Sequence, residues 1–206
     1  MRVAAPRLST GVICIRILAA LSTLAVALLA PAPALAQHGE TRVSVHLPDV
    51  LVLSYLTEVQ LQISGSGQLA GVGNGAVASS DGQGTVGLAL HVDADLAAAV
   101  LSGTVDATLT GQLGGVFSVI GTSASGQLRV SATVERSTAT HPGGAILQVT
   151  QATARIGGRQ APSVAFEAPG LAAAVSGGLG IAVDVTEAHL AGWYQGVTLR
   201  LLVEQI

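Results

Sequence analysis

The residue types that could do chemistry gather at one place in this sequence, His91-Val92-Asp93-Ala94-Asp95. If a strand runs through the segment, alternate residues share a face, so that His91, Asp93 and Asp95 would line up. An imidazole with two carboxylates is part of a site for a divalent cation. Calcium takes about six to eight oxygen ligands, however, and the neighbouring sequence supplies no others. The alternative is the solvated face of an edge strand, or a strand end that leads into a helix. We therefore expect neither a metal nor a cofactor here.

Nucleophilic catalysis finds little support. Residues 37–206 contain no cysteine, and no serine stands in a Gly-x-Ser-x-Gly elbow between a strand and a helix. The glycine-rich runs lack the lysine and the following helix of a phosphate-binding loop. A Ser/His/Asp triad assembled in space stays open, because its members need not be close in sequence. We predict that the protein is not an enzyme.

Charge excludes a further class of function. Only 10% of the 206 residues are charged, the formal net charge is −3, and the chain has no lysine. The nine arginines are scattered, so no basic patch can form to neutralise phosphates. We expect no nucleic-acid partner. The hydrophobic fraction of 50% and the low charge also exclude a disordered chain.

The first 36 residues predict a helical signal peptide. Three arginines precede or open an apolar run that extends from residue 17 to residue 30, and a proline-rich segment follows it. Ala34 and Ala36 fit the small-x-small rule for cleavage before Gln37. The apolar run is shorter than the roughly 20 residues that a membrane-spanning helix needs. We expect an exported protein, periplasmic, on the cell surface or secreted, with no membrane span after cleavage and a single domain at residues 37–206.

The rest of the chain predicts β-strands, because polar and apolar residues alternate along it. One short helix is expected at residues 94–101, a weaker helical turn at 171–175, and a long loop or mobile hairpin at 64–85. Many short strands with glycine-rich turns predict an all-β fold, an antiparallel β-sandwich. The expected strands lie at residues 42–47, 50–53, 58–63, 85–92, 104–110, 116–120, 127–134, 145–155, 163–167, 179–186 and 195–204.

A membrane barrel is the alternative fold. Such barrels carry girdles of aromatic residues, whereas this chain has five aromatic residues in all.

Two of these five aromatic residues, Trp193 and Tyr194, are adjacent. Neighbouring strand residues point to opposite faces, so we expect one ring in the core and one near the surface. The surface ring is either structural or a platform for a ligand.

The segment that ends the chain resembles the closing hairpin of bacterial exported immunoglobulin-like proteins, which are pilin-like or similar to spore coat protein U. In those proteins a Gly-x-Tyr-x-Gly turn leads into a final alternating strand, and Gly192, Tyr194 and Gly196 stand at the matching positions. The opening segment Val43-Ser44-Val45-His46-Leu47-Pro48 looks like their first strand. The chain departs from many pilins in having no cysteine pair. The resemblance implies an immunoglobulin-like sandwich and a surface or fibre subunit.

A physical argument leads to the same function. Apolar strands without lysine leave sheet edges unprotected, and such edges template pairing with another chain. We expect protein partners, possibly the protein itself in a homo-oligomer or fibre, with residues 37–47 or 195–204 mediating association. The alternative is a secreted or periplasmic module that binds a small apolar ligand in a pocket between its sheets.

Overall fold

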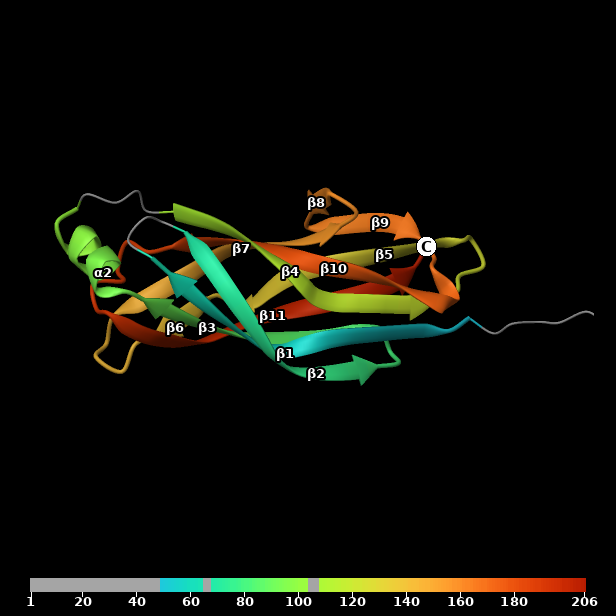
Figure 1. The fold of residues 1–206 in the computed structure, drawn as a ribbon, viewed down its shortest axis with the longest axis horizontal. Helices are drawn as coiled ribbons and strands as arrows, with labels where there is room; N and C mark the ends of the chain where they lie inside the picture. Colours follow the sequence, from blue (N-terminus) through green and yellow to red (C-terminus); the bar gives the residue numbers. More distant parts are fainter. Residues whose placement is uncertain (1–48, 65–67, 104–107) are drawn as a thin grey trace, which may run out of the picture. The chain divides into compact units, whose positions relative to one another are not determined.

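The computed structural model of this chain describes residues 49–64, 68–103 and 108–206 (Figure 1). The expected signal peptide and the strand predicted at residues 42–47 lie outside the described residues. The described part contains eleven strands and one short helix. In chain order these are β1 (Leu51–Ile63), β2 (Leu69–Ser79), β3 (Gln83–Val92), α2 (Ala94–Leu101), β4 (Thr108–Gly121), β5 (Gln127–Arg136), β6 (Thr138–Thr140), β7 (Ile146–Ile156), β8 (Arg159–Ala161), β9 (Ser163–Glu167), β10 (Gly170–Asp184) and β11 (Gly192–Gln205).

Alternation of apolar and polar residues sets which face of each strand is buried. In the second half of β1, Val59, Leu61 and Ile63 are at most 1% exposed, whereas the three polar residues between and before them are exposed. The same period of two places the valines and leucines of β3 in the interior. A buried apolar face and a solvated polar face are what this pattern predicts. The nearly all-β character of the fold is confirmed.

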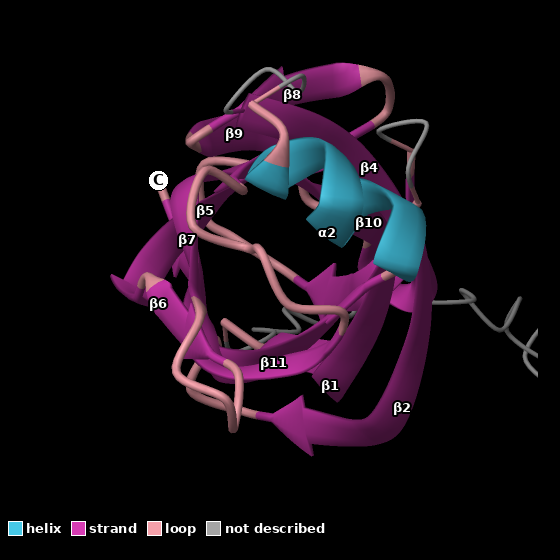
Figure 2. Ribbon diagram, turned by 90° about the vertical axis from the view of Figure 1, so that its left-hand side faces the viewer, coloured by secondary structure: helices cyan, strands magenta, loops and turns pink. Residues whose placement is uncertain are grey.

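Seven of the described strands form a closed ring (Figure 2). From β1 the hydrogen-bonded neighbours follow in the order β4, β10, β7, β6, β11 and β3, and β3 pairs with β1 again. Residues 58–63 of β1 run parallel to residues 87–92 of β3, and the other pairs of the ring are antiparallel. The join between β6 and β11 is narrow, with Gln195 opposite Thr140. The remaining strands lie outside the ring: β2 on β1, β5 and β9 beyond β11, and β8 on β7.

The predicted immunoglobulin-like β-sandwich is therefore wrong, because the sheet closes into a barrel. The immunoglobulin-like fold implied by the terminal segments fails with it. A sandwich and a barrel both bury one face of each strand, so alternation does not distinguish them. The two folds differ in which strands pair with β1. Its residues 51–55 pair with β4, and its residues 58–63 pair with β3, so one long strand joins both sides of the structure.

Apolar side chains fill the interior of the barrel. Fully burying one leucine stabilises the fold by roughly 1.5–3 kcal/mol, before the entropy of ordering the chain is subtracted. The most buried leucines come from five of the ring strands, β1, β3, β7, β10 and β11, and from β5 beside the ring, so all six share one core. Those that are at most 1% exposed in the strands are Leu53, Leu61, Leu90, Leu128, Leu147, Leu179, Leu199 and Leu201.

Two glycines let β10 lie very close to β4. A Cβ atom at Gly178 would lie 2.0 Å from the carbonyl oxygen of Leu113, and one at Gly177 would lie 2.2 Å from the ring of Phe117. The β10–β4 register shifts between Gly177 and Leu179, at the same place. A side chain at either glycine would separate the two strands, so the close approach requires glycine.

Helix α2 matches the expected helix at residues 94–101. It lies at one end of the barrel in both views (Figures 1 and 2). Leu96 and Ala97 face the core, at 0% and 6% exposure. Within the described residues, no helix has the length and the apolar character needed to cross a membrane.

Two segments have a different structure from the one predicted. Residues 64–85 were expected to form a loop or mobile hairpin, but most of them belong to β2 and to the start of β3. The helical turn expected at residues 171–175 is part of β10. The residues of β2 are rich in glycine and alanine, which carry little intrinsic preference for strands, so pairing with β1 decides their conformation. Residues 171–174 lie at a register shift of β10, between Gly170 and Val175, which both pair with β4.

Tyr194 enters the core and Trp193 stays at the surface, which confirms the division predicted from alternation. The Tyr194 side chain is 0% exposed, and Trp193 is 42% exposed. The Tyr194 hydroxyl donates a hydrogen bond to the carbonyl oxygen of Leu190 at 2.7 Å and accepts one from its backbone N–H at 3.3 Å. Burial raises the pKa of Tyr194. The hydroxyl thus fixes the turn that precedes β11.

Asp184 organises the turn that follows β10. Its Oδ1 accepts hydrogen bonds from the Thr186 hydroxyl at 2.6 Å and from the Thr186 backbone N–H at 2.9 Å. The hydroxyl bond is the larger cause that holds the pKa of Asp184 below its usual value, with the backbone bond second. The ionised form of this carboxyl therefore favours the folded state.

We predict that Tyr194→Phe lowers the free energy of unfolding by about 1–3 kcal/mol, because it removes both hydrogen bonds to Leu190 inside the fold. Urea unfolding followed by circular dichroism measures the change. Tyr55→Phe is the matched control, since Tyr55 is half-buried and the structure gives its hydroxyl no hydrogen bond. Equal losses in the two variants would contradict the role given to the Tyr194 hydroxyl.

We predict that Asp184→Asn destabilises the fold near neutral pH but not in acid. A carboxyl whose pKa is lower in the folded state stabilises above its unfolded pKa and stops doing so as the pH falls through the folded value. The difference in unfolding free energy between wild type and variant should therefore begin to shrink near pH 3.8, the ordinary pKa of the group, and vanish once the pH is below the lower folded pKa. Urea unfolding over a pH series checks this, with Glu204→Gln on the exposed end of β11 as control. A difference that does not depend on pH counts against the prediction.

Candidate functional site

The structure separates the three residues of the predicted metal candidate. His91 lies on β3, where its ring contacts the ring of Trp193 at 4.9 Å between centroids. Asp93 is the N-cap of α2, and its Oδ1 accepts a hydrogen bond from the backbone N–H of Leu96 at 2.8 Å. Asp95 is exposed in the first turn of α2. In the described ranges no group of three or more His, Cys, Asp or Glu residues is placed to hold a metal ion. The strand ends at Val92, so the alternation that would align the three residues stops there.

The outer strand β2 has a long unpaired edge (Figures 1 and 2). It pairs antiparallel with β1 over residues 69–79 and with no other strand that the structure describes. Its residues 70–78 are all exposed, Val72 at 75% and Val77 at 42%. The strand contains neither a charged residue nor a proline. Charges, proline and bulges are what proteins use to keep such edges from pairing with other chains.

Glycines explain why β2 lies flat against the barrel. Gly71 is opposite Leu61 in the register, and a Cβ atom on it would lie 2.4 Å from Cδ2 of Leu113 on β4. A Cβ atom on Gly73 would lie 2.0 Å from Cδ1 of Leu56. The first residues of β2 are thus held against β4 by side chains alone, and the accessible part of the edge begins near Val72.

The charge that lies just past the end of β2 belongs to Asp81, in the turn to β3. Asp81 accepts hydrogen bonds from the Ser79 hydroxyl and from the backbone N–H of Gln83, the latter at 3.1 Å. These bonds, the one from Ser79 first, lower the pKa of Asp81. The carboxylate is engaged in its own turn and lies beyond the strand.

Strands β9 and β11 differ from β2, whereas residues 170–177 of β10 form a second stretch that has no partner among the described residues on the side of β7. Strand β9 has five residues, follows Pro162 and ends at Glu167, so it is short and flanked by a proline and a charge. Strand β11 pairs with β3 on one side and with β5 on the other. Residues 198–202 thus have partners on both sides, which leaves little free edge in the segment 195–204 that was expected to mediate association. Residues 37–47, the other expected segment, lie outside the described residues.

A groove of about 850 Å³ runs over the outer face of β10. Its floor contains Gly180 and Ala182, which have little or no side chain. Residues directly opposite one another on antiparallel strands share a face, so the register defines the walls. The walls are Gln112 and Thr110 on β4, and Thr153 and Gln151 on β7.

Two polar bridges cross this groove. Arg155 on β7 donates from Nη1 to Oε1 of Gln112 on β4, at 2.7 Å. Gln160 on β8 donates from Nε2 to Oγ1 of Thr153 at 3.0 Å, and that hydroxyl donates to the carbonyl oxygen of Gly180 at 3.1 Å. A Cβ atom at Gly180 would lie 2.2 Å from Nε2 of Gln160, so the second bridge needs the glycine. Amide and hydroxyl groups line the groove together with apolar side chains such as Leu69, Pro162 and Ile181. The guanidinium of Arg155 is the charged group that binds one of these lining residues.

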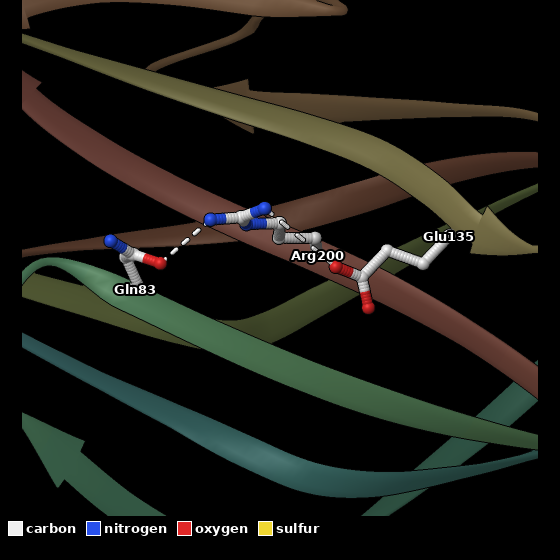
Figure 3. Close-up of polar contacts among 3 residues, drawn as sticks. All are labelled: Gln83, Glu135 and Arg200. Atoms are coloured by element: carbon white, nitrogen blue, oxygen red, sulfur yellow. Dashed lines mark hydrogen bonds and ion pairs between the residues drawn. The ribbon is translucent and has the colours of Figure 1, made fainter.

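Arg200 connects three neighbouring strands on the outer face (Figure 3). From β11 its Nη2 donates to Oε1 of Gln83 on β3 at 2.7 Å, and its Nη1 lies 3.9 Å from Oε1 of Glu135 on β5. Both charged side chains are more than 40% exposed, so the ion pair contributes about 0–1 kcal/mol. We assign this cluster a structural role, because its groups bind one another across adjacent strands.

The sequence analysis predicted neither the exposed strand β2 nor the groove on β10. The sequence pattern of β2 predicts a strand only weakly, because glycines at alternate positions obscure the alternation of polar and apolar residues. No signal marked the groove, because its glutamines and threonines come from three strands that only the register brings together. Comparison with family models, with curated proteins and with solved structures finds no match to this chain.

Proposed function

We propose that this chain is an exported, non-catalytic structural or surface subunit that associates with further copies of itself through the edge of β2. The observation that carries the proposal is the edge of β2 from Val72 onward, which is exposed, uncharged and free of proline. Unpaired N–H and C=O groups along such an edge form a template for another strand. Main-chain hydrogen bonds then supply the affinity of the contact.

The sequence of β2 favours a second copy as the partner. Around Asn74 the strand is nearly symmetric, with glycine on both sides and an alanine four residues away in each direction. In an antiparallel pair centred on Asn74, Val72 would face Ala76 of the second copy and Gly71 would face Val77, so each valine would face a small residue. No like charges meet, because the strand has none. A two-fold contact of this kind uses the same surface on both subunits, as most homodimers do.

The expected leader supports export. Residues 1–36 have the arginines, the apolar run and the small-residue cleavage site of a signal peptide. The product would then work in the periplasm, at the cell surface or outside the cell. A subunit that acts through sheet edges needs no reactive centre, which agrees with the scarcity of titratable groups in the sequence.

The alternative, a module for a small apolar ligand, has less support. Leucine and valine side chains occupy the interior of the barrel. The large groove lies on the outer face of β10, where amide and hydroxyl groups line it together with Leu69, Pro162 and Ile181. It is an open, mixed surface and differs from the apolar pocket between two sheets that this alternative expects.

We predict that Val72→Lys shifts the purified protein from an oligomer toward the monomer. Val72 is 75% exposed, so the substitution costs the fold little, while a lysine on the edge opposes strand addition. Sedimentation velocity over a concentration series should show self-association of the wild type, weakened by about tenfold or more in the variant.

Gln148→Lys is the matched control, since it adds the same charge to an exposed position on β7, which is paired on both sides. It should leave association unchanged. A wild type that stays monomeric at every concentration, or equal weakening by both variants, would overturn the proposal.

A further inference from the structure

One large apolar ring is left in water on the outer face of the barrel. Trp193 is 42% exposed, whereas Tyr194 and Phe117 are 0% and 3% exposed. A protein with five aromatic residues in all gains much of its core area from each of them. Tryptophan side chains are mostly buried on average, so the groups around this half-exposed ring should account for its position.

The register builds a group of polar neighbours around this ring. His91 on β3 is directly opposite Trp193, and Thr140 on β6 is directly opposite Gln195. The His91 ring meets the indole at an interplanar angle of 69°, with the centroids 4.9 Å apart. This edge-on contact holds the indole on the side of β3, and the side toward β6 borders a hollow of about 280 Å³.

The hollow combines one aromatic surface with neutral polar groups. Its lining consists of Trp193, Gln195, Thr140, His141 and Pro142. His141 accepts a hydrogen bond at Nδ1 from the backbone N–H of Gly143 at 2.9 Å, so the neutral ring carries its proton on Nε2 and can donate from there. An amide, a hydroxyl and an imidazole thus stand beside the indole, and neither a carboxylate nor an arginine is among the described residues that line the hollow.

We propose that this hollow is a subsite for one ring of a neutral sugar. A pyranose has an apolar C–H face that can lie on the indole and a rim of hydroxyls that both donate and accept hydrogen bonds. Gln195 and Thr140 can do both in return, and His141 can donate. A cationic ligand would gain from a carboxylate, and an anionic ligand from an arginine, so the lining favours the neutral ligand. The size of the hollow suits a single ring, with the rest of a glycan chain in solvent.

Trp193 is the only tryptophan of the chain, so its fluorescence reports directly on the subsite. The full exported protein is titrated with glucose, galactose, mannose and N-acetylglucosamine, and with their disaccharides. At least one sugar should change the emission saturably, at about millimolar affinity for so open a site. The bound sugar should also protect Trp193 from acrylamide quenching, and saturation-transfer NMR should place the C–H face of the sugar next to the protein.

Single substitutions test which side chains contact the sugar. Gln195→Ala keeps the fluorophore and should weaken binding by about threefold to tenfold, the effect of one hydrogen bond. Trp193→Ala should abolish binding in the NMR assay, and Trp193→Phe, which keeps a ring, should retain part of it. Gln127→Ala is the control, because it removes an exposed amide at the opposite end of the β5–β11 pair. Circular dichroism shows whether each variant folds as the wild type does.

Three results would overturn the proposal. They are the lack of a saturable response to any sugar of the panel, equal binding by wild type and Gln195→Ala, and saturation by tetramethylammonium without any response to sugars. The last result would identify the exposed indole as a site for a cation.

Discussion

Backbone hydrogen bonding between strands is the constraint on which this structure depends. A strand has two edges, and each N–H and C=O group that is buried without a partner costs free energy. Closing the ring through the parallel β1–β3 pair gives the seven barrel strands neighbours on both sides. The strands outside the ring extend the sheet, and β2, which among the described strands pairs with β1 alone, carries a long unpaired edge.

Small residues allow several strands to lie very close to their neighbours. The chain has 26 glycines, and those at positions 71, 73, 177 and 178 occupy places where a Cβ atom would meet a neighbouring side chain or carbonyl group. The same residues shape the outer surface, since the floor of the groove on β10 and the face of β2 are built from glycine and alanine. A backbone that approaches its neighbours this closely presents few side chains, so it presents few charges as well.

The three surface features offer different chemistries. The β2 edge offers main-chain hydrogen bonds, the groove on β10 offers amide and hydroxyl groups, and the hollow beside Trp193 adds one aromatic face to such groups. All three are neutral. In each case specificity must come from shape and from the direction of hydrogen bonds, because charge attraction is lacking. Neutral surfaces of this kind suit contacts that change little with ionic strength.

The sequence by itself determined which side chains face the core. Alternation placed Val59, Leu61 and Ile63 inside and separated Tyr194 from Trp193, and an alanine-rich stretch after Asp93 was enough to locate α2 with its bounds. These features are local, since they depend on the period of the strand or on hydrogen bonds within one turn.

Only the tertiary structure decided how the strands are partnered. The closed barrel depends on β1 pairing with β4 at one end and with β3 at the other, between residues far apart in the chain. Strand β2 exists because β1 pairs along it, although its own glycine-rich residues have little preference for a strand. The groove and the hollow likewise need a register between strands. Alternation constrains the face of a side chain and leaves the neighbour of a strand undetermined, because every sheet with one buried face satisfies it equally.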